Sequence, residues 1–599
     1  MLKTISCGEI NVNNSGETVQ LAGWIHRRRD HGGLIFIDLR DTTGIVQVVI
    51  DPNETPETHK IAETFRNEWV VLVIGTVGLR PEGSANPNIP TGDIEVRATE
   101  VQILNQSKTP PFEIADDATI DELLRMQYRY LDLRTKRMHD NIKLRHRVVK
   151  YIRDFLDNRG FIEIETPILT KSTPEGARDF LVPSRLNPGT FYALPQSPQQ
   201  LKQLLMVSGF ERYFQIARCF RDEDLRGDRQ YEHTQLDIEM SFVDENDVME
   251  LVETLYSSIV REIGVDRVSS DNFPRLKYDD VMEKYGTDKP DLRYDLELVT
   301  LTDSIYETGV RILNTAIDNG GIVKGLVAPG CATYSRKDLD NLVNFVQTRG
   351  GEGLIYIALD GEAANIETLT MEHVKSPISR HLTAEQVIEI AKRTEASPGD
   401  LILLAAGAAK LINTVMSQLR QEIAVRLGLA NPKRLAFAFV TDFPLFEWDE
   451  DNNHWEASHH LFTSPMEEHW SLLDADPGKM KARHYDLVCN GMELASGSIR
   501  IHNRQKQERI MKFLGYTESQ MEDRFGQILG ALEFGAPPHG GIAPGIDRFL
   551  TLLTDHAESI RDVIAFPKTQ SGADPLFNTP SKVTPEQLKE LHIKVSENR

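Results

Sequence analysis

The sequence predicts an α+β protein of several domains, in which a small β-barrel precedes a larger core built on an antiparallel sheet. At 599 residues the chain is too long for one hydrophobic core. Its first 107 residues contain five short strand-like segments separated by turns. Further along, residues 235–242 alternate polar and large apolar side chains, which is typical of a strand with one face on a core.

The bulk composition is that of an ordinary soluble protein, with 40% hydrophobic and 26% charged residues. We expect neither a membrane span nor a secretory signal, because no long apolar run or charged leader is present. The four cysteines lie far apart and form no CxxC pair. This argues against a zinc site and a disulfide scaffold, and it favours a reducing, cytoplasmic location.

Taken alone, the net charge of −23 argues against a nucleic-acid partner, and we do not expect the protein to bind DNA. Two basic clusters weaken this argument. One comprises residues 26–29, and the other comprises eight cations between residues 125 and 147, where the only acidic residues are Asp132 and Asp140. Such patches allow an acidic protein to bind RNA. A solvated helix face explains the second cluster equally well.

The first segment, residues 1–107, has the strand spacing of a five-stranded barrel and suits an OB-fold. Phe36 and Asp38 fall on one face of their strand, and the neighbouring isoleucines and leucine fall on the other. OB-folds bind single strands by stacking bases on aromatic side chains. Phe36 could be a plain core residue, but its place just after Arg27, Arg28 and Arg29 favours RNA contact.

A hinge and a helix–strand unit follow the barrel. The hinge comprises residues 108–140. It contains Pro110 and Pro111 near its start, and the rest is polar and partly helical. Residues 141–158 carry an apolar helical stripe that includes Val148, Ile152 and Phe155. The sequence FIEIETPIL, residues 161–169, is expected to be a strand.

A second helix begins near residue 198. Ser197 is placed to cap it, with Pro198 at its first position and Gln200 completing a capping box. Gln199 and Lys202 then share one face, opposite leucines that we expect to be buried. A lysine near a helix N-terminus opposes the helix dipole, so Lys202 is expected to reach an anionic partner.

Residues 210–242 carry the strongest signal. An apolar strand, 213–220, leads into a charged loop, 221–229, and then into an alternating strand. The alternation predicts a core face and a polar face toward a pocket. The core face comprises Leu236, Ile238, Met240 and Phe242, and the polar face comprises Gln235, Asp237, Glu239 and Ser241.

The last part of the chain returns to charged, pocket-like patterns after residues 291–420, which lack them and receive no catalytic residue. His459 and His460 are adjacent, but successive side chains diverge, so this pair predicts no metal site. Asp486 and Glu493 supply carboxylates suited to magnesium. Arg500 ends a strand and can grip a carboxylate with two parallel bonds. Arg548 sits in the first turn of a helix, a position that suits phosphate.

Together these segments resemble bacterial-type aspartyl-tRNA synthetases of class IIb. The segment GWIHRRRDHGGLIFIDLRD resembles their anticodon-binding barrel, and the 141–169 unit, the 210–242 stretch and GIAPGIDRF resemble motifs 1, 2 and 3. YGTDKPDLR resembles the junction of the inserted α/β domain named GAD. The resemblance implies a homodimer with five parts: the barrel 1–107, the hinge 108–140, the core 141–290, the inserted domain 291–420 and the core with a C-terminal extension 421–599.

The resemblance also implies the reaction. ATP and Mg²⁺ would serve to form aspartyl-adenylate from L-aspartate, and the aspartyl group would pass to the 3′ end of tRNA(Asp). Arg221, Glu223 and Arg548 would be catalytic. ATP would contact Arg221, Asp222, Glu223, Gln230, His233, Glu493, Gly545, Ile546, Asp547 and Arg548. Magnesium would bind Asp486 and Glu493, with Glu223 beside them.

The implied aspartate contacts are Glu175, Gln199, Lys202, Arg221, Asp237, His459 and Arg500. The implied anticodon contacts are Arg27, Arg28, Arg29, His31, Phe36, Gln47 and Gly83. The chain departs from the common family pattern at four places: Tyr231, His233, the pair Ala495 and Ser496, and Pro544.

The loop DHGG together with LRPEG resembles the non-discriminating enzymes, which also charge tRNA(Asn), and makes His31, Gly32 and residues 81–83 the candidates for this property. A discriminating enzyme and an asparaginyl-tRNA synthetase remain alternatives. A lysyl enzyme is disfavoured, because Lys202 and Arg500 would repel lysine. A synthetase-like protein that lost catalysis is also disfavoured, because such proteins usually lose the motif arginines or carboxylates.

Overall fold

The computed structural model describes residues 2–116, 118–172, 177–264, 267–269, 272–305 and 308–596. The chain divides into two compact units, Met1–Asp140 and Asn141–Arg599. The described helices include none that is long and apolar enough to cross a membrane. All four cysteines are buried thiols.

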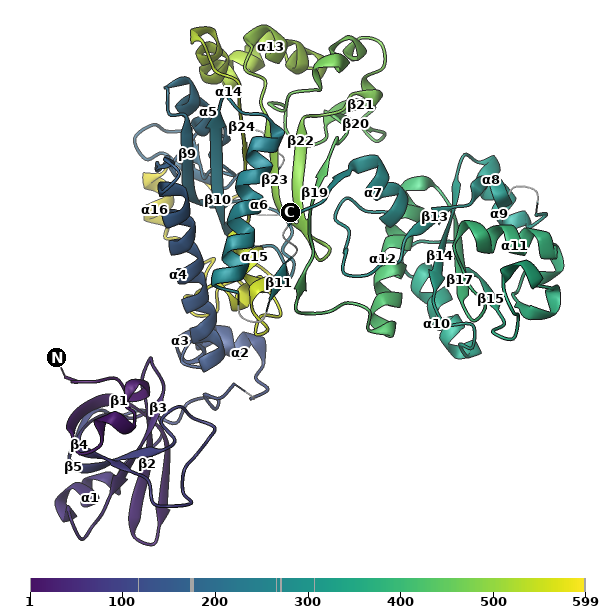
Figure 1. Cartoon of the computed structure of the whole chain (residues 1–599). Coiled ribbons are helices and arrows are strands. Elements are labelled where there is room, and N and C mark those ends of the chain that lie inside the picture. Colours follow the sequence, from purple (N-terminus) through teal and green to yellow (C-terminus); the bar gives the residue numbers. More distant parts are fainter. Residues whose placement is uncertain are drawn as a thin grey trace. The chain divides into compact units, whose positions relative to one another are not determined.

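The first unit contains a closed five-stranded barrel in the order β1-β2-β3-β5-β4 (Figure 1). Its elements are β1 (Thr18–His31), β2 (Leu34–Arg40), β3 (Ile45–Ile50), α1 (Pro56–Ala62), β4 (Val70–Leu79) and β5 (Ile94–Asn105). Ile35, Ile37 and Leu39 of β2 are fully buried, whereas Phe36 and Asp38 between them are half-buried. The predicted barrel and the faces of β2 are confirmed. Two short helices, α2 (Glu122–Gln127) and α3 (Arg129–Asp132), follow.

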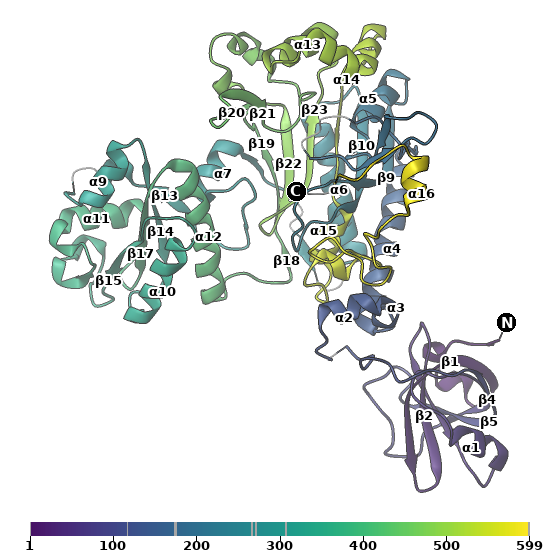
Figure 2. The same cartoon turned by 180° about the vertical axis from the view of Figure 1, so that it is seen from behind.

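The second unit is organised around an eight-stranded sheet in the order β12-β19-β22-β23-β24-β10-β9-β6 (Figures 1 and 2). All its neighbours are antiparallel except β12 with β19 and β6 with β9. The strands are β6 (Ile162–Glu163), β9 (Arg212–Phe220), β10 (Glu232–Ser241), β12 (Arg275–Lys277), β19 (Phe437–Thr441), β22 (His484–Cys489), β23 (Met492–Ile499) and β24 (His539–Ile542).

Helices α4 (Lys136–Asp157), α6 (Glu245–Glu262) and α15 (Ile546–Leu553) pack their apolar stripes into one core with this sheet. Leu236, Ile238 and Met240 of β10 belong to that core, as the alternation predicts. Phe242 does not: β10 ends at Ser241, and Phe242 has φ of 61° and is 67% exposed. The predicted core role of Phe242 is therefore wrong, because the left-handed backbone turns its side chain out of the strand pattern.

Two local expectations differ from the structure. The predicted strand 161–169 is reduced to the two residues of β6, and Ile162, Ile168 and Leu169 are all exposed. The helix expected at 198 is α5 (Gln199–Val207), which has Pro198 at its N-cap and no side-chain cap. Ser197 Oγ accepts the Gln199 N–H at 3.3 Å, but the N-cap position belongs to Pro198, so the predicted capping box does not form. The buried face of α5 is Gln199, Lys202, Gln203 and Met206, and the leucines are half-buried.

Residues 298–407 of this unit form a separate five-stranded sheet in the order β13-β14-β17-β15-β16. Its strands are β13 (Leu298–Thr300), β14 (Ile322–Ala328), β15 (Ile355–Leu359), β16 (Val374–Lys375) and β17 (Leu401–Gly407), and all pairs are antiparallel. Alternate residues of β17 enter two different cores, so helices cover both faces (Figure 1). The helices are α8 (Thr302–Ile305), α9 (Arg311–Asp318), α10 (Arg336–Gln347), α11 (Ala384–Arg393) and α12 (Ala409–Leu427).

The remaining elements are short and lie around the large sheet. Three small ribbons pair β7 (Leu181–Pro183) with β8 (Phe191–Ala193), β11 (Val268–Ser269) with β18 (Arg434–Leu435), and β20 (Phe446–Asp449) with β21 (His454–Ala457). The other helices are α7 (Tyr278–Tyr285), α13 (Arg504–Phe513), α14 (Glu518–Ala531) and α16 (Pro585–Glu590).

Candidate active site

A cavity of about 450 Å³ opens on the polar face of β10, between α5, β23 and the first turn of α15. Its lining comes from segments far apart in the sequence. It includes thirteen of the residues expected from the sequence: Gln199, Lys202, Arg221, Glu223, Gln230, His233, Asp237, His459, Glu493, Arg500, Gly545, Asp547 and Arg548.

Three other expected site residues are placed differently, and Glu175 lies outside the described residues. Asp222 is not in the lining, and its carboxylate lies 3.9 Å from Arg178. Ile546 is 1% exposed within the hydrophobic core, so only its backbone can face a ligand. Asp486 is buried behind the lining, where it contacts His484.

Four buried charges form the group that we call the floor of the cavity: Lys202, Asp237 and Arg500 line it, and the fully buried Glu239 lies behind them. Lys202 Nζ lies 2.8 Å from Asp237 Oδ1 and 3.2 Å from Glu239 Oε2. Arg500 donates to both carboxylate oxygens of Glu239, at 3.0 and 3.2 Å. Although burial opposes ionisation, Arg500 and Lys202 lower the pKa of Glu239 to about 2. Two cations and two carboxylates therefore balance each other, and burial raises the pKa of Asp237 despite Lys202.

Several buried polar atoms of side chains that line the cavity have no hydrogen-bond partner within the described part of the chain. They are Gln199 Nε2, Gln230 Nε2, Gln235 Nε2, Arg221 Nε and Asp237 Oδ2. An unsatisfied buried polar group costs about 1–3 kcal/mol, so such groups in one cavity indicate a site for a polar ligand. The donors and the lone carboxylate oxygen suit a ligand that carries both acceptors and an ammonium group.

Two arginines lie at the other end of the cavity. Arg221 follows β9, and Arg548 occupies the first turn of α15, where the helix dipole favours anions. Arg548 is held by the Glu493 carbonyl at 2.9 Å and by the Asp228 carboxylate at 3.2 Å. Glu223 in turn accepts from Arg229 at 3.0 Å. These cations can neutralise a polyphosphate.

His233 lines the cavity between these arginines as a neutral ring. Burial, and then Arg221 and Arg548, lower the pKa of His233 to about 3. A neutral imidazole can stack on a nucleobase without adding charge next to the arginines. Ala495 and Ser496, another departure from the common pattern, also line the cavity, and the Pro544 carbonyl accepts the backbone N–H of Leu236 at 2.8 Å.

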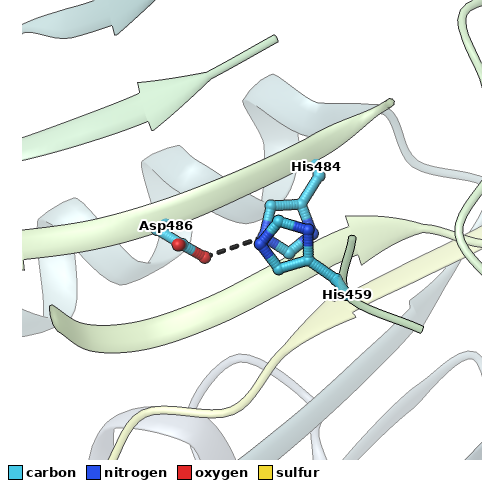
Figure 3. A group of neighbouring side chains, drawn as sticks. All are labelled: His459, His484 and Asp486. Atoms are coloured by element: carbon cyan, nitrogen blue, oxygen red, sulfur yellow. Dashed lines mark hydrogen bonds and ion pairs between the residues drawn. The ribbon is translucent and has the colours of Figure 1, made fainter. Parts of the chain in front are cut away.

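His459, His484 and Asp486 form a compact group beside the cavity, shown in Figure 3. The two imidazoles are stacked with centroids 3.5 Å apart, and His484 Nε2 lies 2.9 Å from Asp486 Oδ1. His460 points elsewhere and lies 2.9 Å from the Arg500 guanidinium. The adjacent histidines therefore diverge as expected, while His484 is a neighbour of the site that sequence reasoning missed.

Asp486 and Glu493 are suited to a divalent cation. Burial raises the pKa of Asp486 to about 6, and burial and then Asp486 raise the pKa of Glu493. Two neighbouring carboxylates with raised pKa values are stabilised as anions by a cation between them. Asp288 and Lys289, which follow α7, also influence both pKa values, and the sequence did not connect them to the site.

The expected anticodon residues lie on the barrel of the first unit. Arg27 and Arg29 of β1 pair with Asp38 and Phe36 of β2, so these four side chains share one face. Arg29 donates to Asp38 at 2.7 Å and to Gln47 at 3.3 Å. Gln47 is 7% exposed and is also held by Glu95.

The other three expected residues, Arg28, His31 and Gly83, have different surroundings. Arg28 pairs with the buried Ile37 and donates to the Ala62 carbonyl at 3.2 Å, so it lies on the other face of β1. His31 is exposed at the end of β1. Gly83 is exposed in the loop between β4 and β5, with φ of 80°, a conformation that favours glycine.

The fold and this site define a class II aminoacyl-tRNA synthetase. Residues 121–570 match the family of class II tRNA synthetases for D, K and N, and residues 19–104 match the OB-fold nucleic acid binding domain. Asparaginyl-tRNA synthetase from Pyrococcus horikoshii, in complex with asparaginyl-adenylate, shares the fold, with a TM-score of 0.58 at 19% identity over 98% of this chain and 100% of that one.

Within that class, the chain belongs to the aspartate–tRNA(Asp/Asn) ligase family. It is 52% identical to the enzyme of Dehalococcoides mccartyi strain CBDB1 over 99% of both chains. It is 52% identical to that of Moorella thermoacetica over 98% of this chain and 96% of the relative. It is 50% identical to that of Syntrophomonas wolfei over the full length of both.

Proposed function

We propose that this protein activates L-aspartate with ATP and transfers it to tRNA(Asp) and tRNA(Asn). The observation that carries the proposal is the buried floor of the cavity, where Lys202 and Arg500 are held by Asp237 and Glu239. Two cations at this depth select an acidic side chain over an amide or an amine of the same size. Relatives at 50–52% identity over the whole chain carry the name aspartate–tRNA(Asp/Asn) ligase and support the same reading.

The substrate amino acid would bind with its side-chain carboxylate toward Lys202 and Arg500. Asp237 Oδ2, buried and without a partner among the described residues, would accept the α-ammonium group, assisted by the carbonyl oxygen of the Gln199 amide. His459 lines the same space, and Glu175 is assigned to the ammonium group from the sequence alone.

ATP would occupy the end of the cavity that holds Arg221, His233 and Arg548. Arg221 would bind the α-phosphate and Arg548 the γ-phosphate, with the adenine against His233. The aspartate α-carboxylate then attacks the α-phosphorus, and pyrophosphate leaves. The protein performs little covalent chemistry; it holds two anions together and neutralises the charge that develops at phosphorus. Mg²⁺, held by Asp486 and Glu493, would supply further neutralisation of the phosphates.

In the second step a ribose hydroxyl of the 3′-terminal adenosine of tRNA would attack the carbonyl carbon of aspartyl-adenylate, forming the ester and releasing AMP. The barrel face with Arg27, Arg29 and Phe36 would bind the anticodon, in which tRNA(Asp) and tRNA(Asn) differ at the third base. The exposed His31 and Gly83 are our candidates for the loop contacts that admit both anticodons.

We further propose a homodimer built on the β6 edge of the large sheet. β6 is the last strand of the sheet, and exposed apolar side chains surround this edge: Ile162 is 50%, Leu169 is 52% and Phe242 is 67% exposed. An apolar sheet edge of this kind needs a partner to avoid uncontrolled pairing. The mass of the protein in solution, measured by light scattering, tests this.

The activity is tested by ATP–pyrophosphate exchange with each amino acid in turn, followed by charging of purified tRNA. We expect exchange with aspartate alone, and aspartyl transfer to both tRNA(Asp) and tRNA(Asn). Exchange with asparagine or lysine instead would reject the substrate. Charging of tRNA(Asp) but not tRNA(Asn) would leave a discriminating enzyme, and exchange with no amino acid would reject the activity.

A further inference from the structure

Helix α4 contacts the candidate ATP site through one side chain, Arg145. Its Nη1 donates to Asp547 Oδ1 and to the Val563 carbonyl, and its Nη2 donates to Thr234 Oγ1 at 2.8 Å. The Arg145 side chain is 20% exposed and that of Asp547 is 4% exposed. A charge pair this far from solvent keeps a fixed geometry far better than a pair on the surface.

The carboxylate of Asp547 connects its own helix, α15, to both α4 and β10. Its second oxygen, Oδ2, accepts the backbone N–H of Thr234 at 2.9 Å. Thr234 lies on β10, whose neighbouring positions Gln235 and Asp237 face the cavity. Both oxygens of Asp547 are therefore used within the protein, one by α4 and one by β10. This assigns Asp547 a structural task although it lines the cavity and was expected to contact ATP.

A second side chain of α4 holds the other end of α15. Asn141 Oδ1 accepts from Thr554 at 3.0 Å, and its Nδ2 donates to the Asp562 carbonyl at 3.1 Å. Thr554 is the C-cap of α15. Since Asn141 and Arg145 are four residues apart, they lie on one face of α4 and reach both ends of the two-turn helix α15.

Arg548 depends on the placement of this helix. It directly follows Asp547 in the first turn, and Gly545 at the N-cap provides no side-chain cap for that turn. Contacts to Glu493 and Asp228 hold the guanidinium, but the backbone that carries it is held by Asp547. A shift of the first turn would move the Arg548 side chain out of register with Arg221.

We propose that Arg145 is a positioning residue of the ATP site: its ion pair with Asp547 fixes the first turn of α15 on β10 and thereby places Arg548. The inference rests on the proposed role of Arg548 toward ATP. It predicts that loss of Arg145 impairs the use of ATP and leaves the aspartate end of the cavity, around Lys202 and Arg500, intact.

The test is steady-state ATP–pyrophosphate exchange of the full-length protein with Arg145→Met, Arg145→Lys and the control Lys150→Met. Lys150 lies on the same helix and pairs with the exposed Asp154. For Arg145→Met we expect kcat/KM for ATP to fall by about 100-fold, the scale of a small misplacement in an active site. KM for aspartate should stay within about twofold. Arg145→Lys keeps a cation for Asp547 and should recover part of the loss, and Lys150→Met should behave as wild type.

A second variant keeps the proposal falsifiable if Arg145→Met folds poorly. Asp547→Asn has the same shape and removes only the charge, and its loss should not add to that of Arg145→Met in the double variant. Equal rises in both KM values, or additive effects, would overturn the proposal. ATP binding measured by calorimetry distinguishes failure of the proposed function from failure of the positioning role. A wild type that binds ATP but shows no exchange refutes the proposed function. Weakened ATP binding in Arg145→Met would still support the positioning role.

Discussion

At the scale of single residues, the cavity floor is a charge-balanced group that is unusual for its depth. The side chains of Lys202, Arg500, Asp237 and Glu239 are at most 3% exposed. Burying ions costs several kcal/mol each unless they are paired with good geometry. Such a group contributes little to stability. Its presence fits a site that must bind another carboxylate and another ammonium group without changing its net charge.

Arg500 is the residue on which we expect recognition of aspartate to depend most directly. We expect Arg500→Leu to abolish adenylate formation, with aspartate-dependent exchange reduced by at least about 1000-fold, because a preorganised cation is lost and Glu239 keeps only Lys202. Arg504, whose partners Glu508 and Glu533 lie at the surface, provides the control Arg504→Leu. Circular dichroism checks folding, and near-normal exchange in a folded Arg500→Leu protein would end the assigned role.

Glu239 gives a prediction for stability against pH. Its pKa in the folded protein is about 2, below the ordinary value of 4.5, so its ionised form stabilises the fold above about pH 4.5 and this contribution is lost as the pH falls toward 2. Glu239→Gln should lower the free energy of unfolding by about 3 kcal/mol at pH 7. The gap to wild type should narrow steadily in urea titrations from pH 5 to pH 3. A gap that does not depend on pH would contradict the coupling to Arg500 and Lys202.

At the scale of elements, the alternation of β10 was sufficient to predict which of its faces is apolar. The pattern has a period of two, and the strand is buried on one side by Leu236, Ile238 and Met240. The pattern could not reveal where the strand ends, and Phe242 therefore fell on the wrong side. Periodicity in 161–169 was likewise compatible with a strand, but β6 ends at Glu163, and the Ile164 N–H that donates to the Phe214 carbonyl is followed by residues outside any strand of the large sheet.

The limits of sequence reasoning in the site have a different cause. Lys202 and Arg500 could be selected because their positions suit an anionic partner. Both side chains contact Glu239, but Arg500 and Glu239 are 261 positions apart in the sequence. Arg145 with Asp547, separated by 402 positions, and His484 beside His459 carry no local pattern. Such contacts follow from the order of strands in the sheet, which no single stretch of sequence encodes.

The barrel face supplies a prediction at this scale. Phe36 is half-buried beside Arg29 and Asp38, where its ring can stack on a base. Phe36→Ala should raise KM for tRNA by about 5- to 150-fold, the equivalent of about 1–3 kcal/mol for one stacked base. Aspartate-dependent exchange without tRNA should be unchanged. Val12→Ala, which removes another exposed apolar side chain of the same unit, is the control. An equal effect on exchange would show that Phe36 acts through stability rather than tRNA.

At the scale of the whole molecule, function is distributed over parts that fold around separate cores. The barrel has its own closed sheet and hydrophobic core, which includes Leu21, Ile37, Val48 and Val73. The large sheet that builds the cavity shares none of these residues. The 298–407 sheet has two cores of its own, and none of the described residues of this segment lines the cavity. We therefore expect amino acid activation to need the large sheet, and tRNA selection to need the barrel as well.

This separation predicts the behaviour of the chain without its barrel. A protein of residues 108–599 should fold and retain aspartate-dependent exchange within a few-fold of the full chain, because all described residues that line the cavity lie beyond position 176. Its charging of tRNA should fall by about 100-fold or more in kcat/KM, since we expect the barrel face with Arg27, Arg29 and Phe36 to supply several base and phosphate contacts. Loss of the barrel should also weaken the dependence of charging on salt, because the cations Arg27 and Arg29 no longer neutralise phosphates. Measurements of exchange, charging and salt dependence on the same preparation distinguish the outcomes. Loss of exchange in a folded 108–599 protein would mean that activation depends on the barrel and that the two functions are not separable.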